Sequence, residues 1–256
     1  MKLKINNVEL NVVESGAGKI ALVFLHYFGG SSRSWKEVIK RLDDDFRCIA
    51  VDLRGFGESD ARGENFLLED YADDVAGLIE HFRIERFVLV GHSMGGKIAL
   101  AFAARQPKNL ESLVLLAPSP PTPEPIPDTE RKHLLESHGN RHAAEETVRK
   151  VVANHLPENI FETAVEDNLR SSETAWRTWL ENGSRVDISE LMPKILVPVL
   201  IVTGAKDKAI GKKVLEREVV PRLTNARLVS IPNAGHLLSL EVPDEIASLI
   251  RKQINS

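Results

Sequence analysis

One serine lies between small residues in a stretch that is typical of a tight turn. The segment Gly91-His92-Ser93-Met94-Gly95 follows the apolar run RFVLVG and precedes MGGKIALAFAARQ, whose apolar residues are spaced as in a helix. Ser93 therefore sits at a predicted strand-to-helix turn, a position in which a serine hydroxyl can serve as a nucleophile. Such a sharp turn brings backbone groups together, so Gly91 and Gly95 are expected where a Cβ would clash. We predict Ser93 as a catalytic nucleophile.

A serine hydroxyl is a weak nucleophile without a base, and one of the eight histidines has a suitable position. His236 lies in the loop PNAGH, between the last predicted strand and the last predicted helix, and α/β proteins build their sites in such loops. His92 is next to Ser93 and is expected to point away from it, as a packing or hydrogen-bonding residue. His26 ends a predicted strand and is expected to have a structural role. We therefore predict His236 as the base.

The base needs a carboxylate on its second ring nitrogen to hold it in the correct orientation. Asp207 follows the apolar run VPVLIVTG and so lies in another loop at the end of a strand. The preceding predicted strand is followed by prolines and a serine, with no carboxylate before Glu124. The sequence thus predicts Asp207 as the group that orients His236.

These positions require a sheet whose strand ends meet at one edge. Continuous apolar runs, as expected for strands buried on both faces, alternate with segments of helical periodicity. We therefore predict an α/β fold with a mostly parallel, doubly wound sheet and helices on both sides. The first residues differ, because their alternating pattern around Asn6-Asn7 predicts a hairpin. The strands predicted from apolar runs span residues 19–26, 46–52, 86–91, 112–118, 197–204 and 226–232.

One segment interrupts this alternation of strands and helices. Five prolines lie between Pro120 and Pro127, a density that no helix or inner strand tolerates, and a long helical pattern follows them. We predict a core domain of residues 1–119 and 188–256 and a helical cap of residues 120–187, inserted before the strand that leads to Asp207. The cap is expected to be mobile and to select the substrate.

The composition is that of an ordinary globular protein. The 256 residues are 43% hydrophobic and 27% charged, and the formal net charge of −4 argues against nucleic acid as the main ligand. No apolar stretch is long enough to cross a membrane and no signal peptide is apparent, so we expect a cytoplasmic protein. The single cysteine, Cys48, lies in a predicted strand, and the histidines show no metal-ligand spacing. We expect no metal and no cofactor. We expect the protein to be a monomer or a homodimer.

The whole pattern resembles the α/β-hydrolase superfamily, in the form that carries a helical cap. The chain order Ser93, Asp207, His236 is that of the superfamily's catalytic triad. Three further stretches resemble its motifs: FLHYFGGSSRSW its first oxyanion loop, VDLRGFGESD the segment after its third strand, and NAGHLLSLEVPDEI its histidine loop. The resemblance covers nearly the whole chain.

The resemblance also implies where an oxyanion would be bound. In this superfamily the N–H group after the nucleophile and one in the first oxyanion loop hold the developing negative charge, and here these belong to Met94 and Phe28. The sequence departs from the commonest pattern at Tyr27, where glycine is usual. We expect the following Gly29-Gly30 to supply the slack that this turn needs.

A triad with an oxyanion hole implies acyl transfer. We expect a serine hydrolase that cleaves a small, largely apolar carboxylic ester or lactone through an acyl-enzyme, with a substrate pocket that includes Trp176, Trp179 and Leu237. Alternatively, the two tryptophans pack the cap onto the core. One alternative function is hydrolysis of a carbon–carbon bond in ring-cleavage diketones, and another is that of a non-enzymatic receptor for a small ligand. Perhydrolysis, as in the cofactor-free haloperoxidases, is expected only as a side reaction. Epoxide hydrolases and haloalkane dehalogenases use an aspartate nucleophile, which Ser93 does not match.

Overall fold

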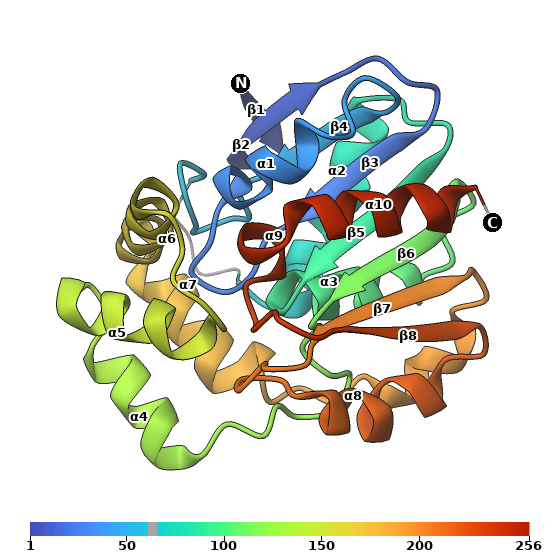
Figure 1. Cartoon of the computed structure of the whole chain (residues 1–256). Helices are drawn as coiled ribbons and strands as arrows, with labels where there is room; N and C mark the ends of the chain where they lie inside the picture. The colour runs from blue at the N-terminus through green and yellow to red at the C-terminus, as the bar shows by residue number, and fades with distance from the viewer. Residues whose placement is uncertain (61–65, 256) are drawn as a thin grey trace.

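A computed structural model describes residues 1–60 and 66–255, and it contains an eight-stranded sheet in the order β1-β2-β4-β3-β5-β6-β7-β8 (Figure 1). The strands from β3 onward are parallel to one another, while β1 pairs antiparallel with β2 and β2 with β4. This architecture confirms the predicted α/β fold. The strands are β1 (Lys2–Ile5), β2 (Val8–Ser15), β3 (Ala21–Leu25), β4 (Arg47–Val51), β5 (Phe87–His92), β6 (Leu110–Leu116), β7 (Val199–Gly204) and β8 (Ala226–Ile231).

The N-terminal hairpin forms where the alternating pattern predicted it. Ile5 pairs with Val8, so Asn6 and Asn7 make a two-residue turn. Both asparagines have positive φ, 47° and 66°, which is the conformation that this kind of hairpin turn requires and that asparagine tolerates. The hairpin extends one side of the sheet and lies away from the strand ends discussed below.

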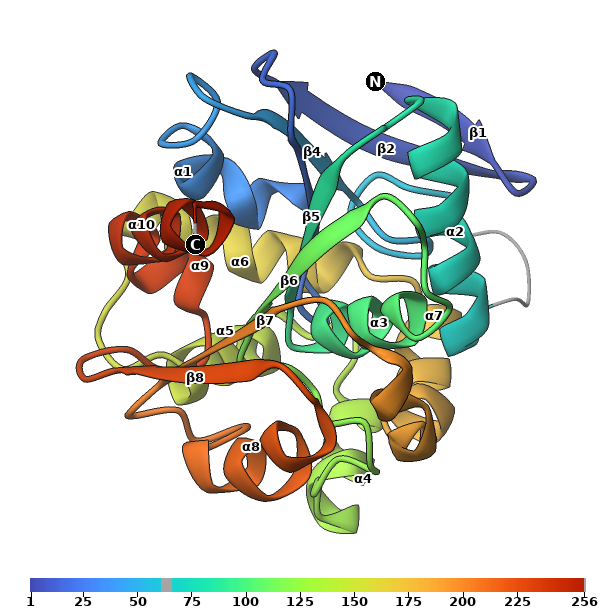
Figure 2. The same ribbon diagram turned by 90° about the vertical axis from the view of Figure 1, so that its right-hand side faces the viewer.

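Two groups of helices cover the two faces of the sheet (Figure 2). On one face, α1 (Lys36–Ile39), α9 (Leu238–Glu241) and α10 (Pro243–Ile254) bury Trp35, Leu238 and Ile246 against the strands. On the other face, α2 (Leu68–His81), α3 (Met94–Ala103) and α8 (Lys212–Glu218) bury apolar residues such as Tyr71 and Ile98. Every residue of β3, β5 and β7 is buried, which explains why these strands read as continuous apolar runs. None of the described helices is long and apolar enough to cross a bilayer.

Four α-helices lie between β6 and β7, and they gather at one end of the sheet (Figure 1). They are α4 (Asp128–Glu136), α5 (Arg141–Val151), α6 (Glu158–Arg170) and α7 (Glu173–Thr178), followed by a π-helical turn at Trp179–Gly183. We call residues 120–187 the helical insertion. Phe161 and Val165 of α6 pack with Val148 of α5 and with Tyr27 and Leu237 of the core, in an apolar cluster separate from those of the sheet.

Buried polar contacts fasten the helical insertion to the core at several places, two of which involve α6 and the end of α5. At the first, Asp167 of α6 accepts hydrogen bonds from the Ser31 hydroxyl (2.7 Å) and from Nε of Arg33 (2.8 Å). At the second, which we call the 151–153 contact, the backbone N–H of His236 donates to the carbonyl of Val151 (2.8 Å), and the Ala153 N–H donates to the Glu241 carboxylate (2.8 Å). The second contact ties the end of α5 to the loop that precedes α9.

Candidate active site

The turn between β5 and α3 holds Ser93 in a strained backbone conformation. Its φ of 51° and ψ of −114° lie outside the regions that non-glycine residues favour. The turn is tightly enclosed: a Cβ at Gly91 would lie 2.4 Å from the carbonyl oxygen of Gly95, and a Cβ at Gly95 would lie 2.5 Å from that of Leu25. The Ser93 N–H donates to the Leu116 carbonyl (2.9 Å), so the neighbouring strand supports the turn. The glycines are therefore needed for the close approach that the sequence predicted.

The structure brings Ser93, His236 and Asp207 together in one hydrogen-bonded chain. The Ser93 hydroxyl lies 2.9 Å from His236 Nε2, and His236 Nδ1 lies 2.8 Å from Asp207 Oδ2. The other carboxylate oxygen of Asp207 accepts from the N–H groups of Ala209 (2.8 Å) and Ile210 (3.0 Å), which fixes the plane of the carboxylate. These three side chains come from loops after β5, β7 and β8.

The charge distribution prepares His236 to accept a proton. Burial alone would lower the pKa of His236, but the charge of Asp207 and its hydrogen bond outweigh burial and raise the pKa above its ordinary value. Burial works in the opposite direction on Asp207, and the charge of His236 together with the hydrogen bonds from His236 and from two backbone N–H groups lowers the pKa of this carboxyl. Asp207 is therefore ionised at neutral pH and stabilises the imidazolium form of His236.

The two backbone N–H groups that the sequence predicts for an oxyanion have no acceptor among the described residues. Among residues 1–60 and 66–255, the N–H groups of Phe28 and Met94 donate to no other protein group. His26 Nδ1 lies 2.7 Å from the Tyr27 carbonyl oxygen, and the Gly30 N–H donates to the same oxygen (2.9 Å). The N–H of a trans peptide points opposite to its carbonyl, so these bonds turn the Phe28 N–H away from His26. Glycine is usual at the position of Tyr27 in the superfamily that the sequence resembles, but the tyrosine does not prevent the backbone from making this turn.

His92 lies behind the base and holds its backbone. His92 Nε2 lies 2.7 Å from the His236 carbonyl oxygen, and Nδ1 lies 3.4 Å from the Ser239 hydroxyl. Burial lowers the pKa of His92 to about 3, so its ring is neutral, with one nitrogen donating and the other accepting. The side chain thus makes hydrogen bonds away from the Ser93 hydroxyl.

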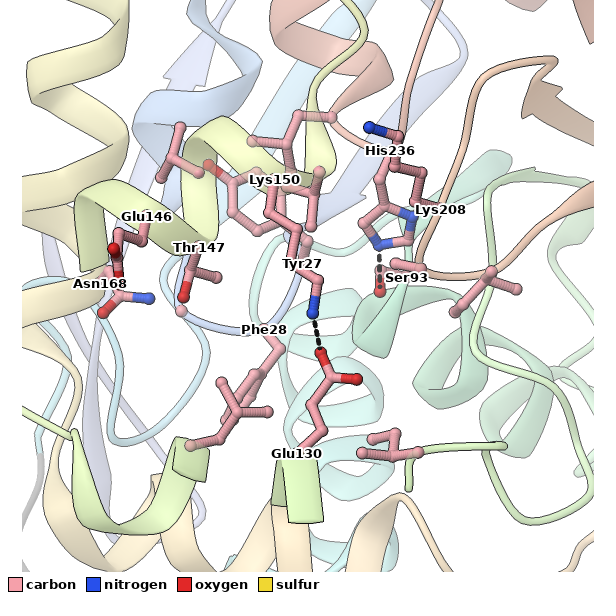
Figure 3. Close-up of a pocket in the computed structure, with 18 of the residues that line it drawn as sticks. Tyr27, Phe28, Ser93, Glu130, Glu146, Thr147, Lys150, Asn168, Lys208 and His236 are labelled. Carbon is pink, nitrogen blue, oxygen red and sulfur yellow. Dashed lines mark hydrogen bonds and ion pairs between the residues drawn. The ribbon is translucent and has the colours of Figure 1, made fainter. Parts of the chain in front are cut away.

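A cavity of about 710 Å³ opens beside Ser93 and His236. Its size is within the range of small-molecule sites. Figure 3 shows Ser93 and His236 on one side of it and Glu146, Thr147 and Asn168 on the other. The core lines it with Tyr27, Phe28, Gly29, Ser93, Lys208, Ala209, Ile210, His236 and Leu237, and the helical insertion supplies residues between Glu124 and Asn168.

Of the two alternatives for Trp176 and Trp179, the structure favours packing of the insertion onto the core, since neither lines the cavity; Leu237 does line it. Trp176 is only 4% exposed, its ring stacks at 4.1 Å from that of Phe28, and its indole N–H donates to the Leu134 carbonyl. Trp179 is 2% exposed and belongs to the apolar cluster of the sheet. The large apolar surface of each indole is used to pack the insertion against the core.

The helical insertion supplies charged as well as apolar side chains to the cavity wall. Lys150 of α5 forms an ion pair with Glu130 of α4 (2.5 Å; Figure 3). Sequence reasoning missed Asn168 and Lys150, because nothing in a helical pattern tells which polar side faces a cavity; Glu124 carried a weak signal through its position after a strand end. Within the described ranges, no three His, Cys, Asp or Glu side chains are grouped as a metal site would require.

Comparisons with known proteins agree with this arrangement. Residues 22–249 match the Alpha/beta hydrolase family. The chain is 30% identical over 261 residues to 2-(acetamidomethylene)succinate hydrolase of Mesorhizobium japonicum, covering 96% of this chain and 91% of that protein. It is 26% identical over 252 residues to a bifunctional esterase/perhydrolase of Acinetobacter calcoaceticus, covering 90% of each.

The fold is similar to that of solved structures as well. The esterase from Exiguobacterium antarcticum superposes with a TM-score of 0.91, covering 100% of this chain and 99% of that one at 22% identity. The family match extends over most of the sequence and agrees with the sheet topology. The chain therefore belongs to the alpha/beta hydrolase family and is a hydrolase.

Proposed function

We propose that this protein hydrolyses a small carboxylic ester through a covalent acyl-enzyme on Ser93. The observation that carries the proposal is the hydrogen-bonded chain from Ser93 through His236 to Asp207, which opens onto a cavity beside two N–H groups that have no described protein acceptor. The similarity to an esterase/perhydrolase over 90% of the chain supports the same class of reaction. The acyl group is small and apolar, and it packs on the Phe28 and Leu237 side of the cavity.

The reaction follows from the positions of these groups. Ser93 Oγ attacks the carbonyl carbon of the ester while His236 Nε2 takes the hydroxyl proton, and the N–H groups of Phe28 and Met94 hold the negative oxygen. His236 then gives this proton to the departing alkoxide, which leaves as the alcohol. A water molecule, deprotonated by His236, attacks the acyl carbon, and the carboxylic acid leaves when Ser93 regains its proton.

We also propose that the helical insertion acts as a cap that selects the substrate. It contributes none of the three side chains of the Ser93–His236–Asp207 chain, but it contributes a large part of the cavity wall. Substrates that differ far from the ester bond would therefore be distinguished by the insertion, and the ester bond itself by the core.

A covalent probe tests the nucleophile directly. A fluorophosphonate should label the wild-type protein once and the Ser93→Ala variant not at all, because the probe captures an activated serine hydroxyl. Ser137→Ala, which changes a serine outside the cavity wall, is the matched control and should be labelled like the wild type. Equal labelling of the Ser93→Ala variant would exclude Ser93 as the nucleophile.

A substrate panel tests the reaction class. Esters of graded acyl length, lactones and diketones should be compared under the same conditions, and we expect the short esters to be turned over fastest. Faster turnover of a diketone would favour carbon–carbon bond hydrolysis by the same residues. Binding without turnover of any member would favour a receptor for a small ligand.

A further inference from the structure

Glu124 belongs to the cavity wall near the nucleophile, and the reaction described above gives it no role. Glu124 lines the cavity together with Ser93 and His236. Its carboxylate accepts a hydrogen bond from the hydroxyl of Ser119, and the backbone N–H of Ser119 donates to the carbonyl of Ser93 (3.0 Å). Two hydrogen bonds thus link Glu124 to the nucleophilic residue.

The chain holds Glu124 in a fixed place. Pro123 and Pro125 flank it, and proline restricts the backbone on either side. The Glu124 N–H donates to the Ser184 carbonyl (2.8 Å), which joins the beginning of the insertion to its end. Together with the hydrogen bond from Ser119, these constraints make Glu124 a preorganised acceptor.

The cations near Glu124 are bound elsewhere. Lys97 Nζ donates to the carbonyls of Thr122 (3.2 Å) and Val186 (2.6 Å), and Arg131 donates to the Leu180 carbonyl and to the Ser184 hydroxyl. Neither Lys97 nor Arg131 lines the cavity. In the part of the chain that the structure describes, the hydrogen-bond partner of the Glu124 carboxylate is the Ser119 hydroxyl, and the charges of Lys97 and Arg131 act on it only from beyond direct contact.

The positively charged side chains that line the cavity form no ion pair with Glu124 either. Lys150 is paired with Glu130, and Lys208 is exposed to solvent. A bound molecule near Ser93 therefore meets one carboxylate that has no directly bonded cation in the described part of the chain. Burial raises the pKa of Glu124, and a ligand that brings a positive charge to it would favour its ionised form.

We propose that Glu124 forms a subsite for a positively charged group on the alcohol part of the ester. The inference rests on the proposed ester hydrolysis. The alcohol oxygen must lie within reach of His236 Nε2, which protonates it, and Glu124 is near enough to His236 for its charge to act on that ring. The apolar surface of Phe28 and Leu237 remains for the acyl group.

A matched pair of esters tests this subsite. Butanoylcholine and 3,3-dimethylbutyl butanoate have nearly the same shape and differ in the charge of the alcohol. The wild type should show a kcat/KM for the choline ester that exceeds that of the neutral ester, and Glu124→Gln should reduce this ratio by roughly 10- to 100-fold, as for the loss of one charged interaction in a cavity. Glutamine retains an acceptor for the Ser119 hydroxyl, so the loop should remain in place.

The control is Glu146→Gln, which removes a carboxylate from the opposite side of the same cavity (Figure 3). It should retain the preference for the choline ester within about threefold, since Coulomb interactions weaken with distance and screening. Equal preference of the wild type for both esters would overturn the subsite. An equal reduction of both rates in Glu124→Gln would also overturn it and would assign Glu124 to the support of His236.

A binding measurement separates this inference from the proposed hydrolysis. Choline should bind the Ser93→Ala variant saturably in calorimetry, and the added Glu124→Gln substitution should weaken this binding about tenfold or more. If the neutral ester is hydrolysed but choline does not bind, the subsite fails and the hydrolase stands. If choline binds in this way while neither ester is cleaved and Ser93 is not labelled, the proposed hydrolysis fails and the subsite stands.

Discussion

The carboxyl edge of the sheet and the helical insertion face the same cavity but hold their side chains in different ways. At the edge, backbone hydrogen bonds from a neighbouring strand and loop fix Ser93 and Asp207, while Val151 of α5 and the ring of His92 hold the backbone of His236. In the insertion, the polar side chains at the cavity wall project from helices whose opposite sides provide the packing, as Thr147 of α5 and Asn168 of α6 show (Figure 3).

This difference teaches where changes are tolerated. A side chain whose position depends on several backbone bonds cannot move without moving strands, so a change at the sheet edge affects every substrate alike. A side chain that projects from a helix into the cavity can be replaced without loss of the fold, so a change there alters which substrate binds. The following experiments test this contrast, beginning with the largest expected effect.

The Asp207→Asn substitution should cause the largest loss. Asparagine keeps the size of the side chain but favours the wrong tautomer of His236, so kcat should fall by about 10³- to 10⁴-fold for all esters, as in other serine triads. Kinetics with two esters of different length measure this, and the melting temperature verifies folding. Near-normal turnover would contradict the role of Asp207, and Glu124 would then be tested as the acid.

Trp179→Ala should act on stability and leave selectivity unchanged. Trp179 lies in the insertion but is buried in the apolar cluster of the sheet, so its removal should lower the free energy of unfolding by about 3–5 kcal/mol. Denaturant unfolding measures the loss, and the ratio of kcat/KM values across acyl lengths should be retained. A changed ratio would mean that the indole reaches the substrate after all.

The activity should depend on pH through the base at the sheet edge. His236 must be neutral to accept a proton, and its pKa is raised above the ordinary 6.5, so kcat/KM should rise about tenfold per pH unit below that pKa and level off above it. Asp207→Asn removes the charge that raises the pKa, so the midpoint should move to lower pH. A pH–rate profile that is already flat at pH 6 would contradict this.

The smallest effect is expected for Asn168→Ala on the far wall of the cavity. Loss of one neutral hydrogen bond changes kcat/KM by roughly 2- to 10-fold, and only for esters that carry a polar group at that end. Asn159→Ala, on the exposed side of the same helix, is the control and should change nothing. If Asn168→Ala slowed the shortest ester by the same factor, the proposed division between edge and insertion would be wrong.

The positions of the site residues could be predicted from the sequence because each follows a strand of the parallel part of the sheet. The ends of parallel strands meet at one edge, so identification of the strands already predicted that Asp207 and His236 lie near Ser93. The helix periodicity of the insertion was also readable, but it gives only the apolar face of each helix. It does not tell which partner that face meets, and this is why Trp176 and Trp179 were expected at the cavity while Asn168 and Lys150 were not.

The 151–153 contact has a consequence for how this sequence tolerates insertions and deletions. Val151 ends α5, where carbonyl groups lack partners within the helix, and its carbonyl is instead bonded to the N–H of His236. Because backbone atoms make this bond, the bond itself does not depend on the side chain at residue 151. The number of residues between Asn140 and Val151 is not free, since deletion of one would rotate the end of α5 by about 100° and withdraw the acceptor. The length of α5 is thereby tied to the placement of His236. In a chimera that receives its insertion from a relative, residues 151–153 should therefore be retained from the protein that supplies the core.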